Sequence, residues 1–225
     1  MSKGNLDRYA TEYLDRIAKE LNSSVLSDIL DDHGYRQQVA SPTIRPLYPG
    51  ARVAGRAATM LVVAVRELPT QPYRLLMELL DGIEPGEVIV AGVQGGAAAA
   101  IWGELLSTHT RARGGRGAVL DGLSRDASRI EEMKFPVFAT GVCPSDSKGR
   151  LEVFAIRGAI PIGGVTVSNG DLVMADEDGC VVVPSGVEEK VITEAFQKVA
   201  GENTIREILR NGASIRKVFE EHGIL

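Results

Sequence analysis

The pair Arg125-Asp126 is the feature of this sequence best suited to chemistry. It follows a predicted strand at residues 117–120, which Asp121-Gly122 ends, and it precedes a short predicted helix. A guanidinium can grip a carboxylate through two parallel hydrogen bonds, and one aspartate with several waters is a ligand set that Mg²⁺ accepts. The pair could therefore hold a metal ion and an anion that share one ligand. The alternative is that Asp126 only stabilises the N-terminus of the short helix.

A glycine turn, Gln94-Gly95-Gly96-Ala97, is the second candidate binding element. Glycines allow close backbone approach, and a helix predicted at residues 97–113 would point its free N–H groups at an anion held there. The turn is not a dinucleotide fingerprint, because the third glycine and the downstream acid are not at the required places. It is not a Walker loop either, because no Gly-Lys-Ser/Thr follows it. Tight packing without a ligand is the alternative role of such a turn.

These two turns belong to an alternation of strands and helices between residues 87 and 140. Strands are predicted at 87–91, 117–120 and 136–140, with helices at 97–113 and 123–132 between them. Such an alternation predicts parallel neighbouring strands joined by right-handed crossovers. Both turns would then lie side by side at the carboxyl ends of strands, where open α/β sheets bind their ligands.

The remaining elements are expected to form the scaffold of this crevice. Apolar residues at three- and four-residue spacings predict a helix at residues 5–21, and residues 22–24 offer an N-cap for a second helix at 25–32. One long strand or two short ones are expected at 52–65, and short strands with hairpin turns follow residue 151. Further helices are predicted at 73–80, 187–209 and 214–222. This order fits one α/β domain with a β-rich half and helical ends.

The composition of the 225-residue chain excludes several classes of protein. Hydrophobic residues make up 44% and charged residues 24%, as in ordinary globular proteins, and the formal net charge is −5. No long basic run is present and aromatic residues make up only 5%, so we expect no nucleic-acid partner. The longest apolar run, residues 60–65, is far too short to cross a bilayer, so we expect no membrane partner.

The N-terminus and the cysteines point to the cytoplasm. The first residues carry acids and lack the apolar core of a signal peptide. Cys143 and Cys180 are far apart and have no metal-site spacing, so we expect two buried thiols in a reducing compartment.

The run AIWGELLSTHTRARGGRGAVLDGLSRDASRIEEMKFPVFATGVCP resembles the class II, metal-dependent 4-hydroxy-4-methyl-2-oxoglutarate / 4-carboxy-4-hydroxy-2-oxoadipate aldolases. Those enzymes share their fold with the regulator of ribonuclease activity A (RraA). The family pattern is an acidic residue, twenty positions, and then Arg-Asp, and Glu104 followed by Arg125-Asp126 matches it. The resemblance extends from about residue 26 to residue 209, with residues 1–25 and 210–225 as helical extensions of a single domain, 1–225.

The resemblance implies the fold, the assembly and the reaction. The implied fold is a layered α/β sandwich with a mixed central sheet, of the swivelling β/β/α type, and the implied assembly is a homotrimer or hexamer. The implied reaction is retro-aldol cleavage of a 4-hydroxy-2-oxo acid to pyruvate and a second keto acid, with oxaloacetate decarboxylation as a side activity. The implied cofactor is Mg²⁺ or Mn²⁺.

The resemblance also assigns roles to particular residues. Asp126 would bind the metal directly, and Arg125 would contact the carboxylate or the keto oxygen of the substrate. Backbone amides around Leu105 and Leu106 would bind the same anionic end. The turn formed by Gly95 and Gly96 would help to close this anion pocket.

Acidic residues are assigned to water and proton handling. Glu104 would order metal-bound water or assist proton transfer, although many members of the family carry the shorter aspartate at this position. Glu202 of a neighbouring subunit's C-terminal helix would complete the site, with Glu207 in reserve. Both glutamates could equally be solvated acids on a helix.

Two alternatives to this function stay open. One is a non-catalytic, protein-binding regulator of a ribonuclease, although the regulator from which the subfamily takes its name lacks the acid that follows the arginine. The other is a lyase for a different keto acid or sugar-acid substrate. The residues that could touch a distal carboxylate of the substrate are Arg56, Arg66, His109 and Arg150.

Overall fold

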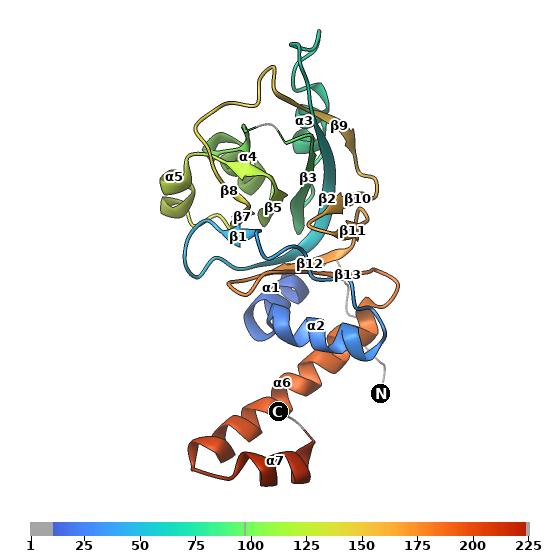
Figure 1. Ribbon diagram of the computed structural model, residues 1–225, viewed down its shortest axis with the longest axis vertical. Coiled ribbons are helices and arrows are strands. Elements are labelled where there is room, and N and C mark those ends of the chain that lie inside the picture. The colour runs from blue at the N-terminus through green and yellow to red at the C-terminus, as the bar shows by residue number, and fades with distance from the viewer. Residues whose placement is uncertain (1–10, 97, 224–225) are drawn as a thin grey trace.

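A mixed β-sheet forms the centre of the molecule, and helices pack against it (Figure 1). The computed structural model describes residues 11–96 and 98–223. Within these ranges the sheet has eight strands in the order β1-β7-β5-β3-β2-β12-β13, and β9 also pairs with β2. The neighbours β7, β5, β3 and β2 are parallel, and the other pairings are antiparallel. The predicted layered α/β fold with a mixed central sheet is therefore confirmed.

The strands of this sheet are runs of β-branched and small apolar residues, which suit a sheet that is covered on both faces. The strand expected at 52–65 is a single long one. The bounds are β1 (Arg45–Pro46), β2 (Val53–Ala64), β3 (Glu87–Gln94), β5 (Gly117–Asp121), β7 (Val137–Ala139), β9 (Leu151–Ile156), β12 (Leu172–Ala175) and β13 (Cys180–Val183).

The chain leaves β3, β5 and β7 to form a second, parallel sheet of three short strands. These strands are β4 (Ala100–Trp102), β6 (Leu123–Ser124) and β8 (Gly141–Val142), in the order β4-β6-β8. Gly122 separates β5 from β6, and a Cβ atom there would lie 2.5 Å from Cγ2 of Val93. The three segments therefore run in parallel through two successive sheets, and their carboxyl ends lie at one edge.

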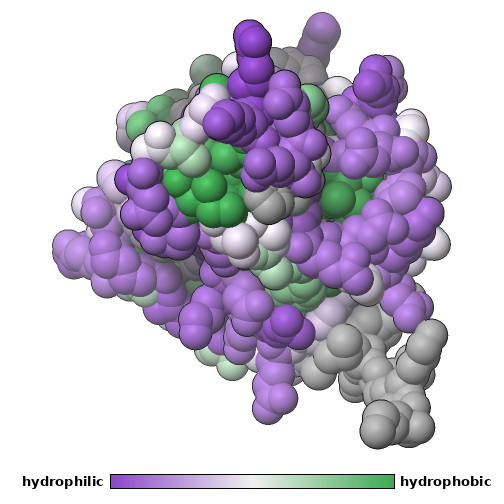
Figure 2. All heavy atoms as spheres, turned by 90° about the horizontal axis from the view of Figure 1, so that it is seen from below, coloured by the Kyte–Doolittle hydropathy of each residue, from purple (hydrophilic) through white to green (hydrophobic). Residues whose placement is uncertain are grey.

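Helices from both ends of the chain form one layer below β12 and β13 (Figure 1). They are α1 (Thr11–Glu20), α2 (Ser23–Asp32) and α6 (Glu188–Arg210), and α7 (Ile215–His222) follows at the far end of α6. Seen from below, the surface is mostly hydrophilic and has a few hydrophobic patches (Figure 2). The predicted N-cap of α2 is present, because the Asn22 side chain accepts the Val25 N–H at 2.8 Å. Among the described residues, no helix is both long enough and apolar enough to cross a membrane.

The remaining elements surround the larger core. These are α3 (Arg74–Asp81), α4 (Glu104–Ala112), α5 (Ala127–Glu132) and the hairpin of β10 (Ile160–Ile162) and β11 (Val165–Val167). Trp102, Phe135 and Phe138 are the largest of its side chains and are almost fully buried. Burial of such aromatic residues is the main source of stability in a core of this kind.

The helix expected at 97–113 begins later than predicted. Residues 100–102 form β4, in which Ala100 and Trp102 pair with β6, and α4 starts only at Glu104. The alanines before Ile101 favour a helix by intrinsic propensity, but tertiary pairing and burial override that weak preference. The helix N-terminus therefore lies beyond the glycine turn that was expected to open it.

The short helix expected at 123–132 also begins later. Leu123 and Ser124 form β6, where they pair with β8, and α5 starts at Ala127. The predicted helix at 5–21 is confirmed for α1, and its residues 5–10 lie outside the described part of the chain.

A buried ion pair joins the long strand β2 to the layer of terminal helices. Arg56 of β2 meets Glu188, the first residue of α6, through two contacts, one of them 2.6 Å from Nη2 to Oε1. The hydroxyl of Tyr13 in α1 donates to the same carboxylate at 3.3 Å. The two charged side chains are 4% and 2% exposed, so each depends on the other for charge compensation.

Glu188→Ala is expected to lower the free energy of unfolding by about 3 kcal/mol or more, because it removes this carboxylate from the buried Arg56 guanidinium. Urea denaturation followed by circular dichroism measures the loss. The matched control is Glu20→Ala, which breaks an exposed pair with Arg16 on α1 and should cost less than about 1 kcal/mol. Equal losses in the two variants would contradict this account.

Candidate functional site

The carboxyl ends of β4, β6 and β8 meet at one edge of the short sheet. Arg125, directly after β6, donates its backbone N–H to the carbonyl oxygen of Trp102 at 2.9 Å. The loop after β8 is tied to the start of β4, because Ala100 N–H donates to Ser145 O at 2.8 Å. This pairing brings Asp146, which follows Ser145, to the same edge as Arg125.

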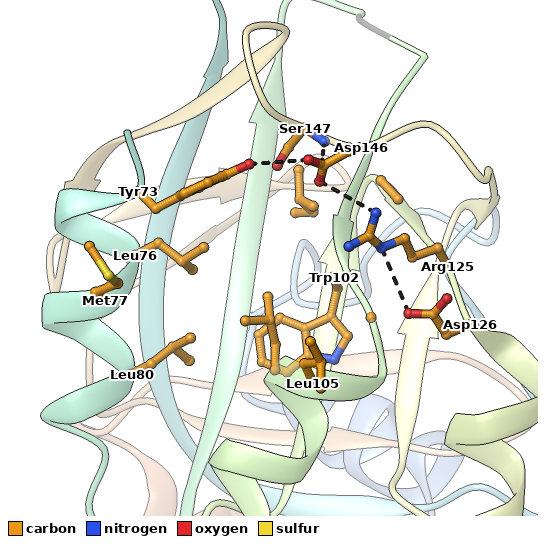
Figure 3. A pocket seen from close by; sticks show the side chains of 14 residues that line it. Tyr73, Leu76, Met77, Leu80, Trp102, Leu105, Arg125, Asp126, Asp146 and Ser147 are labelled. Carbon is orange, nitrogen blue, oxygen red and sulfur yellow. Dashed lines mark hydrogen bonds and ion pairs between the residues drawn. The ribbon is translucent and has the colours of Figure 1, made fainter. Parts of the chain in front are cut away.

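A cavity of about 300 Å³ opens at this edge (Figure 3). One wall is polar and carries the side chains of Arg125, Asp126 and Asp146, with Tyr73 and Ser147 beside them. The rest of the lining is apolar and comes from helices α3 and α4 and from β4. The apolar side chains are Leu76, Met77 and Leu80 of α3, Ile101 and Trp102 of β4, and Leu105 and Leu106 of α4.

Trp102 joins the cavity to the first turn of α4. Its indole Nε1 donates to Ser107 Oγ at 2.8 Å, and that hydroxyl donates to Gly103 O at 3.0 Å. The indole is only 1% exposed, so its N–H needs this partner. The tryptophan therefore fixes how α4 starts relative to β4.

Asp126 is directed at the N-terminus of α4. Its Oδ2 accepts the backbone N–H of Glu104 at 3.2 Å, so the carboxylate satisfies one free donor of that helix. Asp126 stands at the N-cap position of α5, but its side chain makes no capping hydrogen bond there. Its φ of +58° is a left-handed conformation that aspartate adopts at some cost. The alternative expected from the sequence was that Asp126 only stabilises the N-terminus of α5. The geometry shows instead that its carboxylate stabilises the N-terminus of α4.

Gly103 allows this close approach. A Cβ atom at Gly103 would lie 2.7 Å from Asp126 Oδ2 and 3.1 Å from Arg125 Cγ. Its backbone is extended, with φ −165° and ψ −170°, so any residue could adopt the conformation. Space alone therefore requires glycine at this position.

Arg125 lies between two carboxylates. Its Nε is 3.7 Å from Asp126 Oδ2, and its Nη1 is 3.5 Å from Asp146 Oδ1 (Figure 3). The guanidinium side chain is 38% exposed, which leaves part of it open to a ligand. An arginine held in this way presents a fixed fork of donors to a carboxylate or keto oxygen.

Tyr73 and Asp146 belong to the site but were missed in the sequence. Tyr73 precedes α3, and its hydroxyl donates to Asp146 Oδ2 at 3.2 Å (Figure 3). Ser147 N–H donates to the other carboxylate oxygen of Asp146 at 2.9 Å. Partial burial and the nearby charge of Asp146 raise the pKa of Tyr73. No local pattern marks these residues, because only the long-range pairing of β4 with the loop after β8 brings them together.

The residues of the first turn of α4 lie where a binding role requires them. Leu105 and Leu106 both line the cavity, and the side chain of Leu105 is 74% exposed. Glu104 contributes its N–H to Asp126, while its side chain accepts the Thr108 hydroxyl at 2.8 Å. The structure thus brings Glu104, Leu105 and Leu106 beside the Arg-Asp pair.

The glycine turn is not part of this group. Gly95 has a φ of +95°, and a Cβ atom there would lie 2.7 Å from that of Ala64, so the glycine packs against the end of β2. Neither Gly95 nor Gly96 is among the described residues that line the cavity. The expectation that this turn opens α4 was wrong, because β4 stands between them.

Glu202 and Glu207 lie on α6, which runs away from the central sheet toward α7 (Figure 1). Within one chain α6 packs against α2 and α1 rather than against the cavity. Glu207 Oε1 accepts a hydrogen bond from Nη1 of Arg210 on the same helix at 2.5 Å. Any contribution of these glutamates to the cavity would have to come from another copy of the chain.

The cations proposed for a distal carboxylate lie elsewhere. Arg56 is in the buried ion pair with Glu188, and His109 Nε2 is 3.3 Å from a backbone carbonyl of α3. Arg150 donates to a backbone carbonyl of the loop after β8 at 2.9 Å, and Arg66 is exposed. None of the four is among the described residues that line the cavity.

The donors around Arg125 suit a hard cation. Among the described residues no group of three histidine, cysteine, aspartate or glutamate side chains is placed to enclose a metal. Asp126 offers one carboxylate beside an open cavity, and Mg²⁺ or Mn²⁺ takes one or two carboxylates and keeps several waters. A zinc site with three or four protein ligands is a poorer match to this donor set.

Comparison with known proteins gives a family match. The model of the RraA-like family, described as Aldolase/RraA, matches residues 23–182. A Halalkalibacterium halodurans protein named "Putative 4-hydroxy-4-methyl-2-oxoglutarate aldolase" is 30% identical over 222 residues, which cover 98% of each chain. Protein DlpA of Legionella pneumophila is 29% identical over 202 residues, or 89% of this chain, and the chain spans only 32% of that protein's length.

A solved structure of similar fold is that of Streptomyces coelicolor RraAS2, described as an unusual member of the RNase ES inhibitor RraA protein family. It is 30% identical to this chain, with a TM-score of 0.79, and the match covers 89% of this chain and 99% of that one.

We expect Tyr73 to ionise above the ordinary phenol pKa of about 10. Its hydrogen bond to Asp146 should therefore persist through neutral and mildly alkaline pH. Because the folded pKa is raised, this contribution to stability is complete below pH 10 and is lost as the pH rises further. A difference titration of phenolate absorbance between the parent protein and Tyr73→Phe measures the pKa, and a value below 10 would contradict the prediction.

Proposed function

The chain belongs to the RraA-like (Aldolase/RraA) family, and on this basis we propose that it is a divalent-metal-dependent carbon–carbon lyase. The substrate is a 4-hydroxy-2-oxo acid of the 4-hydroxy-4-methyl-2-oxoglutarate type. Retro-aldol cleavage gives pyruvate and a second carbonyl compound, which for that substrate is a keto acid. The observation that supports this proposal best is the Arg125-Asp126 pair, held at the N-terminus of α4 in the mouth of a cavity.

The 2-oxo acid end of the substrate is anionic, and it binds to backbone N–H groups and to a positively charged side chain. The first N–H groups of α4 have no acceptor inside the helix, and that of Glu104 already serves Asp126. The amides of Leu105 and Leu106 can therefore serve the substrate carboxylate, aided by the positive end of the helix dipole. Arg125 adds a guanidinium on the adjacent side.

Asp126 holds Mg²⁺ or Mn²⁺ in this proposal. The bound ion supplies a Lewis acid for the negative charge that develops at the 2-oxo group. Cleavage breaks the C3–C4 bond and leaves its electron pair on the pyruvate fragment, whose enolate oxygen carries the charge. Arg125 faces that charge and stabilises it electrostatically. Oxaloacetate passes through the same enolate on losing CO₂, so its decarboxylation is a side activity.

Two acids handle the protons. Glu104, positioned by Thr108, orders water at the cavity mouth and assists removal of the C4-hydroxyl proton. Glu202 of a neighbouring copy, with Glu207 in reserve, completes the site in a homotrimer or hexamer. This assembly is part of the proposal, because α6 within one chain points away from the cavity.

A protein-binding regulator of a ribonuclease is the second candidate function. The likeness to Streptomyces coelicolor RraAS2 supports it. Such a regulator needs no metal and releases no pyruvate, so the two functions differ in one assay.

Asp126→Ala is expected to lower pyruvate release by about 100-fold or more, because it removes the proposed metal ligand. Lactate dehydrogenase coupling measures pyruvate from 4-hydroxy-4-methyl-2-oxoglutarate and from oxaloacetate with Mg²⁺ or Mn²⁺. Asp32→Ala, which removes an exposed aspartate of α2, is the control and should keep full activity. Absence of metal-dependent release from both compounds by the folded parent protein would exclude them as substrates, and absence from other 4-hydroxy-2-oxo acids as well would reject the lyase and favour the regulator.

Gly103→Ala tests the geometry of the pair without changing its chemistry. The added Cβ would push against Asp126 Oδ2 and Arg125, and a displacement near 1 Å can cost about 100-fold in rate. The displaced atoms belong to side chains, so the free energy of unfolding should fall by no more than about 3 kcal/mol. Gly186→Ala is the control, because Gly186 is exposed and a Cβ there meets nothing within 4 Å. Full activity in Gly103→Ala would show that the contact with Asp126 is not needed.

A further inference from the structure

The polar and apolar parts of the cavity face different ends of a ligand. Arg125, Asp126 and Asp146 lie on one side, and Leu76 and Leu80 point from α3 toward the other (Figure 3). We propose that the part of the substrate beyond its 4-hydroxyl group is uncharged and apolar, an alkyl or aryl group rather than a second carboxylate. This inference rests on the proposed lyase function and names its substrate class.

The charges of the cavity favour a substrate with one carboxylate. Among the described lining residues Arg125 is the one full cation, and it already lies 3.7 Å and 3.5 Å from the carboxylates of Asp126 and Asp146. With the divalent ion proposed on Asp126, these three side chains sum to a net charge of +1, which one substrate carboxylate neutralises. A second substrate carboxylate would add negative charge without a cation to receive it, and burial of an unpaired carboxylate is costly.

Helix α3 turns its charges away from the cavity. Arg74 and Glu78 are 3.4 Å apart and are 58% and 59% exposed, and neither is among the described lining residues. The same helix contributes Leu76, Met77 and Leu80 to the lining. The helix is therefore amphipathic, and its apolar face rather than its charged face meets the ligand.

Apolar side chains remain open to water around this hollow. Leu105 is 74% exposed and Met77 is 54% exposed, although both line a concave site of about 300 Å³. Exposed apolar groups that gather in a cavity of this size are typical of small-molecule sites. They are continuous with Arg125 and Asp126, so the remainder of a ligand bound by that pair would lie against them.

The reaction on such a substrate balances without a redox partner. In R–CH(OH)–CH₂–CO–COO⁻ the C3–C4 bond breaks, the hydroxyl proton goes to the base, and C3 gains a proton. The products are pyruvate and the aldehyde R–CHO. The second product is thus uncharged and can leave through the apolar side.

Binding of two unreactive probes tests the inference apart from catalysis. 2-Oxoglutarate and 5-methyl-2-oxohexanoate have the same 2-oxo acid end, and the second replaces the distal carboxylate by an isopropyl group of similar shape. Neither has a 4-hydroxyl group, so neither undergoes retro-aldol cleavage. Trp102, the single tryptophan of the chain, lines the cavity and reports binding by fluorescence in the presence of Mg²⁺.

We expect the isopropyl probe to bind the full-length protein about tenfold tighter or more, because its apolar group leaves water. Equal affinities, or tighter binding of 2-oxoglutarate, would overturn the proposal. Equal affinities are also the result if a second copy of the chain covers the apolar wall instead.

Met77→Arg introduces a cation into the apolar wall and should shift the affinity ratio about tenfold toward 2-oxoglutarate. Leu68→Arg is the matched control, because Leu68 is also 54% exposed and is not among the described lining residues. The same shift in both variants would overturn the proposal, since it would reflect net charge rather than the cavity wall.

Pyruvate release separates this inference from the proposed function. The two substrates are 4-hydroxy-4-methyl-2-oxoglutarate and 4-hydroxy-2-oxo-4-phenylbutanoate, and we expect the phenyl compound to have the higher kcat/KM. Release from both with preference for the dicarboxylate keeps the lyase and overturns the inference. Release from neither overturns the lyase, while the probe affinities still decide what the apolar wall binds.

Discussion

The close approach of Gly103 and Glu104 to Asp126 is the constraint on which the site depends. Parallel pairing of β4 with β6 fixes the distance between the two chain segments, and only glycine leaves room for the carboxylate. The N–H of Glu104 and the dipole of α4 then stabilise Asp126 in a left-handed backbone conformation that is costly by itself. The geometry of the Arg-Asp pair is therefore set by a sheet rather than by a mobile loop, as pre-organised sites require.

The short sheet also divides the tasks of the cavity among different elements. Strand ends supply the charged groups, whose positions are coupled by backbone hydrogen bonds between Arg125 and Trp102 and between Ala100 and Ser145. Helices α3 and α4, together with β4, supply the apolar groups, which would touch a ligand without fixing its orientation. Changes on α3 can thus alter what is bound without moving the charged pair, in keeping with the general finding that one scaffold hosts several functions.

The sequence predicted the parallel α/β core, because β3, β5 and β7 are short apolar runs separated by clear turn residues. It also placed Arg125 and Asp126 at a strand end. The sequence-based prediction failed where tertiary pairing opposes local preference. Residues 100–102 were predicted as helix, because their pairing with β6 leaves no local pattern in the sequence. For the same reason Asp146 and Tyr73 were missed, since the hydrogen bond between them spans 73 residues. The family resemblance, rather than periodicity, directed attention to Leu105 and Leu106.

The layer of terminal helices has a consequence for synthesis on the ribosome. Helices α1 and α2 are made first, but the apolar side chains of Leu14, Ile17 and Leu26 pack on β12, β13 and α6. Those elements begin about 140 residues later, which is on the order of ten seconds of translation. During that interval the first two helices carry an uncovered apolar stripe, the kind of surface that chaperones bind. The nascent chain therefore completes this layer only after β12, β13 and α6 have emerged, so the layer forms later than the elements encoded between them.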